Sequence, residues 1–295
     1  MVMPDVLTDL APAKINLSLR VLGQRADGYH RLDSLVGFAE IGDRLSVAAG
    51  EGLSLTVTGP FASALRGTPP DQNLVFRAAD ALRIAIGRPD LGAALTLEKH
   101  LPIASGIGGG SADAAAALRL LPRLWGLDPE TLPLADIAAR LGADVPMCLL
   151  GKSARVGGVG DIIDPVPLPR IAAVLVNPGV PVETKAAFTA REGEFSLPLL
   201  ALPPLQTVDD LAGLVQRGGN DLTRPALTLA PVIADVLKAL RAAPNCRAAA
   251  LSGSGATCFG LFPTRDARTE AAARIKTAHP DWWVAGTWIG ERDKR

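Results

Sequence analysis

A glycine-rich segment about a third of the way along the chain constrains the fold and the chemistry more than any other feature of the sequence. Residues 102–115 read Pro-Ile-Ala-Ser-Gly-Ile-Gly-Gly-Gly-Ser-Ala-Asp-Ala-Ala, and a helix is predicted over 112–121. The N–H groups of such a turn can point inward around an anion, and a helix start adds unpaired N–H groups and the positive end of its dipole. The segment is therefore predicted to bind a di- or triphosphate.

Three other interpretations of the glycine-rich segment are weaker. The spacing G-x-G-G-G-S does not fit the G-x-G-x-x-G of a dinucleotide fold, and the segment does not follow a first strand. A Walker A loop would need a glycine where Pro146 stands before Gly151-Lys152-Ser153. A flexible turn remains open, but four glycines with two serines at a helix start exceed what a turn needs.

Composition narrows the class of protein. The chain has 295 residues, 48% of them hydrophobic, which suits two domains better than one. Lys+Arg and Asp+Glu are 30 each, so the net charge is zero, which argues against a nucleic-acid partner and gives no reason to expect a membrane surface.

The cysteines and the first residues indicate a cellular compartment. The three cysteines form no C-x-x-C pair, so a disulfide framework or a zinc site is not expected and a reducing cytoplasm is predicted. The start of the chain, Met1 to Asp5, shows neither the basic nor the apolar region of a signal peptide.

Strands and helices alternate irregularly along the chain, which predicts an α+β fold rather than a doubly wound α/β sheet. A domain boundary is predicted at 163/164, between a turn at 157–161 and three prolines, which gives domains 1–163 and 164–295. A hairpin is predicted from 44–48 and 53–58. The other predicted strands are 14–21, 93–98, 171–176, 247–252, 257–262 and 283–289, and the helices are 73–86, 112–121, 135–141, 183–190, 207–217, 231–242 and 266–278.

Two further sites carry polar residues in patterns that suggest a function: one face of the strand over 14–21, and Asp144. In the strand over 14–21, Lys14, Asn16 and Ser18 share one face by period-two alternation. Asp144 stands before Val145-Pro146, and because proline suits the first turn of a helix, Asp144 is predicted at or beside an N-cap. On these patterns alone, a solvated lysine and a plain capping aspartate remain open.

Several sequence blocks together resemble the GHMP small-molecule kinases. They are Ala11 to Leu17, Gly23 to His30, Leu101 to Ala115, Gly142 to Pro146 and Leu251 to Thr257, in the order of that family. The resemblance implies a ribosomal S5 domain 2-like N-terminal domain and a smaller, ferredoxin-like C-terminal domain. It also implies transfer of the γ-phosphate of ATP, with Mg²⁺, to a hydroxyl group of a small molecule. The stretch Gly-Gln-Arg-Ala-Asp-Gly-Tyr-His points to the branch whose acceptor carries a cytidine diphosphate group.

The resemblance also implies roles for individual residues. Asp144 matches the base of the family and Lys14 its catalytic lysine, and the two are expected to lie within hydrogen-bond reach. The ATP site is expected to comprise Pro102, Ile103, Ala104, Ser105, Gly106, Ile107, Gly108, Gly109, Gly110, Ser111 and Ala112.

The acceptor site is implied in the same way. Tyr29 and His30 match the residues that hold the cytosine, and Phe188 a second stacking aromatic, although a core residue is an equal alternative for Phe188. Asn16, Gly253 and Ser254 complete the expected acceptor site. No metal ligand is predicted: Asp113 is the only acidic residue in the loop, and the metal is expected mostly on the phosphates and water, with Ser111 as a further candidate.

Some alternatives stay open. The loop departs from the family at Ala104 and Ser105, where glycines are usual, and these small replacements are expected to leave the phosphate cradle intact. A homoserine-type or mevalonate-type kinase would not need the cytosine residues, and a non-catalytic ATP sensor would be free to lose Lys14 or Asp144, yet both are present. The sequence does not indicate an oligomeric state.

Overall fold

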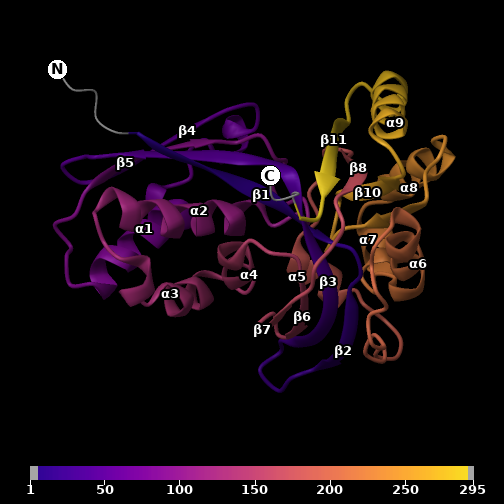
Figure 1. Cartoon of the computed structure of the whole chain (residues 1–295), viewed down its shortest axis with the longest axis horizontal. Coiled ribbons are helices and arrows are strands. Elements are labelled where there is room, and N and C mark those ends of the chain that lie inside the picture. Colours follow the sequence, from indigo (N-terminus) through magenta and orange to yellow (C-terminus); the bar gives the residue numbers. More distant parts are fainter. Residues whose placement is uncertain (1–5, 292–295) are drawn as a thin grey trace. The chain divides into compact units, whose positions relative to one another are not determined.

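The structure is a computed structural model that describes residues 6–291 (Figure 1). The chain forms two compact units. The first comprises Met1–Ala13, Ile41–Ile103 and Gly108–Gly151, and the second comprises Lys14–Glu40, Ala104–Ile107 and Lys152–Arg295. The chain passes between the units several times, so the units interleave in sequence. The predicted domain division at 163/164 is a single cut and stays a prediction.

The first unit packs helices against a sheet (Figure 1). Its strands follow the order β4-β5-β3, with β1 also paired to β3. Helix α2 presents an almost continuous run of small buried residues, Ala112 to Ala117, which lets its neighbours approach closely. Two strands continue into the second unit: β1 (Leu7–Asn16) belongs to the first unit up to Ala13, and β3 (His30–Ala48) from Ile41 on. The other elements are β4 (Leu53–Thr58), β5 (Ala93–Glu98), α1 (Leu74–Ala85), α2 (Gly109–Leu124), α3 (Leu134–Leu141), α4 (Val145–Leu150) and the 3₁₀ turns Ala62–Leu65, Pro70–Gln72 and Pro129–Thr131.

The predicted hairpin between 44–48 and 53–58 is wrong, because β5 lies between the two strands. Arg44 of β3 pairs antiparallel with Glu98 of β5, and Leu53 of β4 pairs in parallel with Ala93. The turn after β3 passes close over the start of β5: a Cβ on Gly92 would lie 2.1 Å from the carbonyl oxygen of Gly50. A hairpin was predicted because the two segments are close in sequence. In the structure, β5, whose residues are alternately buried, pairs with both β3 and β4.

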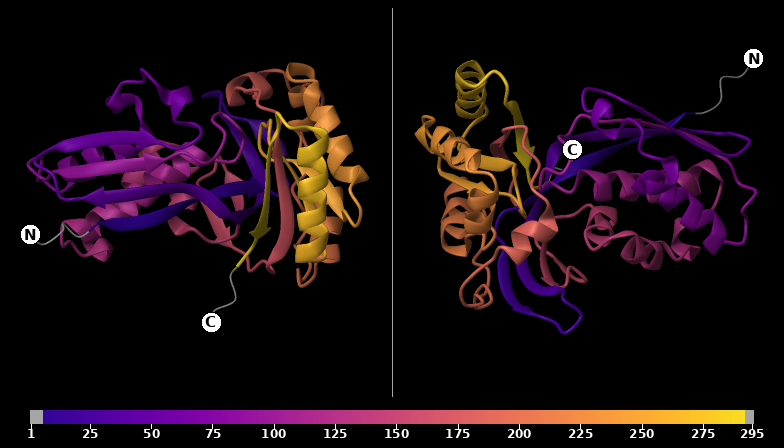
Figure 2. Two further views of the ribbon diagram at one scale, coloured as in Figure 1. Left: turned by 90° about the horizontal axis from the view of Figure 1, so that it is seen from above. Right: turned by 180° about the vertical axis from the view of Figure 1, so that it is seen from behind.

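The second unit has a sheet of order β9-β10-β8-β11-β3 with helices on one face (Figure 2). Every residue of β8 is buried, which explains its uninterrupted apolar sequence. The elements are β2 (Arg20–Gln24), β6 (Ala154–Gly158), β7 (Ile162–Pro165), β8 (Ile171–Asn177), β9 (Ala248–Leu251), β10 (Cys258–Phe262), β11 (Trp283–Ile289), α5 (Thr184–Thr189), α6 (Val208–Gly218), α7 (Thr223–Leu229), α8 (Val232–Ala242) and α9 (Arg265–Ala278).

The α+β class is confirmed, and the strand predicted over 14–21 needs correction. That stretch breaks at 17–19, because the backbone N–H groups of Leu17 and Ser18 both donate to the carbonyl oxygen of Leu35. Strands β6 and β7 and helix α7 were not predicted, whereas the turn between β6 and β7 was. Helix α2 begins at Gly109, earlier than the predicted 112, because its first turn includes the glycines of the loop.

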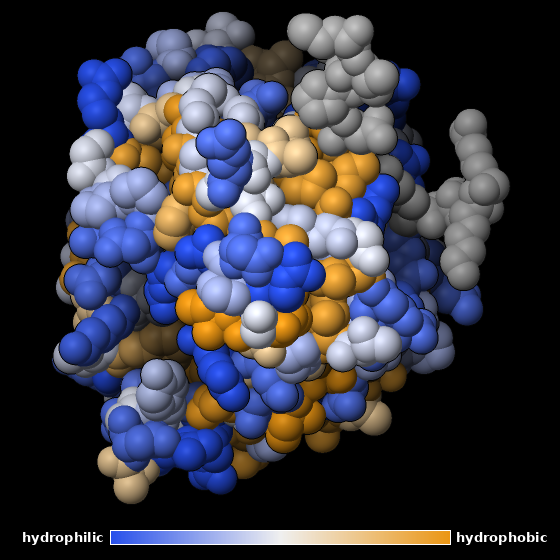
Figure 3. Space-filling view, turned by 90° about the vertical axis from the view of Figure 1, so that its left-hand side faces the viewer, coloured by the Kyte–Doolittle hydropathy of each residue, from blue (hydrophilic) through white to orange (hydrophobic). Residues whose placement is uncertain are grey.

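Hydrophobic side chains on the face drawn in Figure 3 occur in patches that hydrophilic side chains interrupt. Among the described residues, no helix has the length and apolar character needed to cross a membrane. None of the described cysteines forms a disulfide; Cys148 and Cys258 are buried and Cys246 is half-buried.

Candidate active site

The backbone of the glycine-rich loop alternates in a way that suits an anion. The φ angle is positive at Ala104 (49°), Gly106 (75°) and Gly108 (65°). Alternation between left-handed and other backbone conformations turns successive N–H groups to the same side, which is the geometry of an anion nest. Gly108 is also the N-cap of α2 and uses no side chain to cap it. The loop therefore leads directly into the N–H groups of a helix start, as the sequence predicted.

Within the second unit, the first part of the loop lies against the turn that follows β9. A Cβ on Gly106 would lie 2.5 Å from the carbonyl oxygen of Ser252 and 2.6 Å from the nitrogen of Gly255. The hydroxyl of Ser252 donates to the carbonyl oxygen of Gly106 at 3.1 Å, and the N–H of Thr257 donates to that of Ser105 at 3.1 Å. Glycine at position 106 is therefore required by close packing as well as by its φ angle.

Lys14 and Asn16 are buried beside the same loop. Their side chains are joined, Lys14 Nζ donating to Asn16 Oδ1 at 2.9 Å, and Asn16 Nδ2 donates to Ser34 Oγ at 2.8 Å. The backbone N–H of Lys14 donates to the carbonyl oxygen of Ile107 at 2.9 Å. Lys14 is only 5% exposed, so the alternative of a solvated lysine does not hold. A buried ammonium group in a polar network is typical of a functional site.

Asp144 occupies the N-cap position of α4, as predicted, but its carboxylate does not cap the helix. The plain capping role therefore fails to account for this aspartate. Arg119 anchors α4 within the first unit, because its Nη1 donates to the carbonyl oxygen of Cys148 at 2.9 Å while its Nε bonds Asp9 at 2.7 Å. Asp144 and Lys14 belong to different units, and their pairing stays a prediction.

His30 and Phe188, far apart in sequence, stack with ring centroids 4.8 Å apart and planes inclined by 20°. Burial first, and then the positive charge of Arg191, lower the pKa of His30, so the neutral imidazole with one donor and one acceptor nitrogen is favoured. Phe188 also packs against the small cluster of Leu19, Val21 and Leu222. Phe188 is thus partly a core residue, and its role toward cytosine stays a prediction. Tyr29 is 61% exposed beside this pair.

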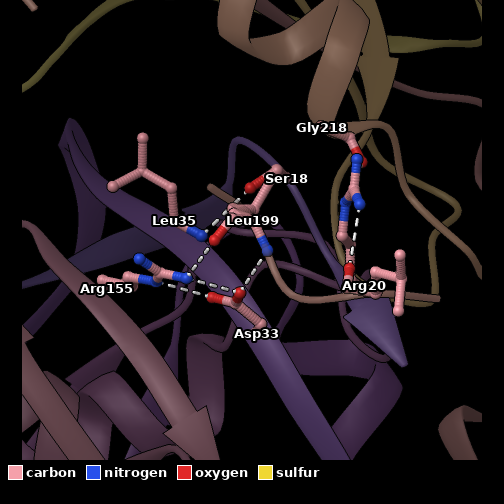
Figure 4. Close-up of polar contacts among 8 residues, drawn as sticks. Ser18, Arg20, Asp33, Leu35, Arg155, Leu199 and Gly218 are labelled. Carbon is pink, nitrogen blue, oxygen red and sulfur yellow. Dashed lines mark hydrogen bonds and ion pairs between the residues drawn. The ribbon is translucent and has the colours of Figure 1, made fainter. Parts of the chain in front are cut away.

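Polar residues that sequence reasoning missed hold this part of the second unit together (Figure 4). Asp33 accepts two bonds from Arg155, at 2.8 and 2.7 Å, and a third from the N–H of Leu199 at 2.7 Å. Arg20 donates to the carbonyl oxygens of Leu197, Arg217 and Gly218. No local pattern in the sequence joins Asp33 to Arg155, which are 122 residues apart.

The turn predicted to approach the loop is fixed by a further residue that the sequence did not reveal. Asn220 donates from Nδ2 to the carbonyl oxygens of Leu251 at 2.9 Å and Gly253 at 2.8 Å. Ser254 is 4% exposed and its hydroxyl lies 3.0 Å from that of Thr184, at the start of the helix that carries Phe188. The structure therefore links the turn at 252–255 both to the loop and to the aromatic pair.

A stability prediction follows from the loop backbone. Ala104 adopts a left-handed conformation that costs an alanine about 1 kcal/mol and a glycine almost nothing. We expect Ala104→Gly to raise the free energy of unfolding by up to that amount, measured by urea denaturation. Ala104→Val, which adds a β-branched side chain at the same φ, is the opposite control and should lower it. Equal unfolding midpoints for all three proteins would contradict the assigned backbone.

A metal held mainly by the phosphates of ATP stays a prediction. No group of three or more His, Cys, Asp or Glu side chains suited to a metal ion occurs within residues 6–291. Asp113, the acidic residue of the loop region, is 2% exposed, and its Oδ2 accepts from the ammonium of Lys99 at 2.7 Å, so one of its two carboxylate oxygens is already used.

Comparison with known proteins identifies relatives over nearly the whole chain. Residues 73–152 match the family model "GHMP kinases N terminal domain" and residues 197–281 match "GHMP kinases C terminal". A protein of Cereibacter sphaeroides named 4-diphosphocytidyl-2-C-methyl-D-erythritol kinase is 54% identical over 280 residues, which cover 93% of this chain and 96% of that protein. A protein of Parvibaculum lavamentivorans with the same name is 51% identical over 96% of this chain and 98% of its own length.

Solved structures agree with these relatives. A crystal structure of 4-(cytidine 5'-diphospho)-2C-methyl-D-erythritol kinase superposes with a TM-score of 0.80 at 34% identity, covering 97% of this chain and all of that one. A homoserine kinase from Cytophaga hutchinsonii has a TM-score of 0.69 at 20% identity, over 99% of this chain and 97% of its own, and shows the shared fold alone. On sequence, fold and loop geometry together, the chain belongs to the GHMP kinase family.

Proposed function

We propose that the chain transfers the γ-phosphate of ATP to the 2-hydroxyl of 4-diphosphocytidyl-2-C-methyl-D-erythritol, in the non-mevalonate route to isoprenoid precursors. The family makes it a small-molecule kinase. The observation that carries the choice of acceptor is the name shared by relatives that are more than half identical over more than nine-tenths of the chain. The stacked His30–Phe188 pair supports it, because a planar aromatic surface suits a nucleobase. The cytoplasm is the proposed compartment.

The glycine-rich loop is the proposed ATP site. The positive φ angles at Ala104, Gly106 and Gly108 suit N–H groups that surround phosphate oxygens, and the start of α2 adds its dipole. No side chain larger than isoleucine stands between Ala104 and Ala112, so phosphates can approach the backbone closely. When bound with ATP, Mg²⁺ would neutralise charge on the phosphates.

The proposed chemistry needs a base and a cation. The carboxylate of Asp144 takes the proton of the acceptor hydroxyl while the hydroxyl oxygen forms a bond to the γ-phosphorus. The bond from that phosphorus to the β–γ bridging oxygen breaks, and ADP leaves. The ammonium of Lys14, oriented by Asn16, stabilises negative charge on the reacting oxygens. Its burial strengthens this interaction, because water screens it less.

The protein is proposed to recognise the acceptor through its cytosine, which stacks on Phe188. We expect Phe188→Ala to raise the KM for the acceptor about tenfold or more, because base–aromatic stacking is worth about 1–3 kcal/mol. The KM for ATP should stay within about twofold. Cytidine monophosphate (CMP) should compete with the acceptor in the native protein and lose this effect in the variant.

The matched control is Phe195→Ala in the same unit. Phe195 is 48% exposed and lies beneath Arg191 rather than in the aromatic pair, so its removal should leave CMP inhibition unchanged. CMP that inhibits the native protein and Phe188→Ala equally would remove the stacking role. Failure of CMP to bind the native protein at all would point to another GHMP kinase reaction.

A further inference from the structure

A buried ionic cluster of three residues lies in the first unit, outside the roles assigned so far. The side chains of Lys99, Asp43 and Asp113 are 3%, 0% and 4% exposed. Lys99 Nζ donates to Asp113 Oδ2 at 2.7 Å and also bonds Asp43 Oδ2. Burial lowers the pKa of Lys99, but the two carboxylates outweigh burial and raise it, so the ammonium stays charged.

Such a cluster is costly to bury. Burial raises the pKa of the Asp113 carboxyl to about 7, although the Lys99 ammonium lowers it. Removing such ionisable groups from water carries a penalty that their attraction only partly repays, and hydrophobic residues of similar volume would often serve stability equally well. One oxygen of Asp113, Oδ1, has no hydrogen-bond partner and is buried. The cluster is therefore poorly explained as a means of stabilising the core.

The position of the cluster suggests another purpose. Lys99 follows β5 directly, and Asp43 accepts the backbone N–H groups of His100 at 2.5 Å and Leu101 at 2.8 Å, just before the glycine-rich loop begins. Asp113 lies on α2, just after the last glycine of the loop. The ammonium of Lys99 thus joins the chain on one side of the loop to the helix on the other.

The cluster also contacts the helix start itself. A Cβ on Gly109, the first residue of α2, would lie 3.5 Å from Asp43 Oδ2 and 3.6 Å from Lys99 Nζ. The three side chains are too buried to bind a nucleotide directly. The ammonium also stands between the two carboxylates, where a cation would otherwise bind.

We propose that Lys99, Asp43 and Asp113 are positioning residues that hold the two ends of the glycine-rich loop in fixed register, so that its N–H groups are preorganised for the phosphates of ATP. This inference rests on the proposed ATP site. Preorganised donors bind better because the ordering cost is already met in the free protein. The cluster should therefore affect nucleotide binding specifically, beyond any effect on folding.

The test measures the Kd of a non-hydrolysable ATP analogue by calorimetry, and Tm, for variants of the cluster. We expect Asp113→Ala to weaken binding about tenfold, since hydrogen bonds between charged groups are among the strongest in proteins. Asp113→Asn keeps an oxygen that can accept from Lys99 and should bind within about twofold of the native protein. If Asp113→Ala does not fold, Asp113→Ser replaces it, because the shorter side chain fills part of the space without reaching Lys99.

The matched control is Leu82→Ala, a fully buried residue of α1 in the same unit. It should lower Tm at least as much while leaving analogue binding within about twofold, since a cavity in the core is about 2–5 kcal/mol destabilising without touching the loop. Native-like binding by Asp113→Ala or Asp113→Ser would overturn the inference, as would equal loss of binding in Leu82→Ala. Because no acceptor is present, a wrong acceptor assignment leaves this test intact, whereas absence of analogue binding by the native protein would overturn the ATP site itself.

Discussion

Replacing Asp144 by alanine is expected to lower kcat by ~10²–10⁴-fold, because a positioned general base contributes about that much. The KM for ATP should change little, since the carboxylate acts on the acceptor hydroxyl rather than on the nucleotide. The measurement is ADP release under saturating ATP and acceptor. The structure supports this expectation, since Asp144 stands at an N-cap without capping its helix, so its loss removes no capping bond.

Asp136→Ala is the matched control for Asp144. Asp136 is an exposed acidic residue in the first turn of α3, in the same unit, and its removal should leave kcat within about twofold. A kcat for Asp144→Ala that equals that of the control would exclude Asp144 as the base and redirect attention to a mechanism without a protein base.

Replacing Lys14 by methionine is expected to lower kcat by about 10²-fold or more, since one electrostatic donor to a reacting oxygen is commonly worth that amount. Methionine keeps a similar length without the charge. Lys14→Arg should not restore activity, because a planar guanidinium cannot take the place of a compact ammonium in a 5% exposed site.

Two measurements separate a catalytic from a structural role for Lys14. Loss of the ammonium leaves Asn16 Oδ1 without this donor, so Tm is expected to fall as well. Binding of a non-hydrolysable ATP analogue should nevertheless persist in Lys14→Met. The exposed Lys238→Met in α8 is the control and should match the native protein in both respects. A Lys14→Met protein with native kcat would contradict the proposed mechanism.

Local patterns in the sequence predicted much of the second unit and the backbone of the loop. Local patterns marked β8 as a buried strand and β10 as a strand, and they located the helices α6, α8 and α9. These elements depend on residues close in sequence. The glycines of the loop were also informative by themselves, because few other residues adopt positive φ cheaply.

Features that depend on distant pairing were not accessible in this way. β5 lies between β3 and β4 because it pairs with both of them in place of their pairing with each other. No pattern within residues 44–58 indicates this arrangement. The burial of Lys14 likewise reflects the approach of residues 107 and 252 from elsewhere in the chain.

The same limit applies to the functional residues. The stack of His30 on Phe188 was suggested only by family resemblance, since no local pattern joins the two residues. The cluster of Lys99, Asp43 and Asp113 was invisible in the sequence, because each residue alone resembles an ordinary surface charge.

The most direct test of the central claim is product analysis after incubation of the native protein with Mg²⁺, ATP and 4-diphosphocytidyl-2-C-methyl-D-erythritol. Phosphorus NMR should show a new phosphomonoester on the 2-hydroxyl of the acceptor, formed one for one with ADP and absent with Asp144→Ala. Homoserine and mevalonate, tested in parallel, should remain unphosphorylated. An unchanged acceptor, in a protein that binds the ATP analogue, would contradict the proposed function.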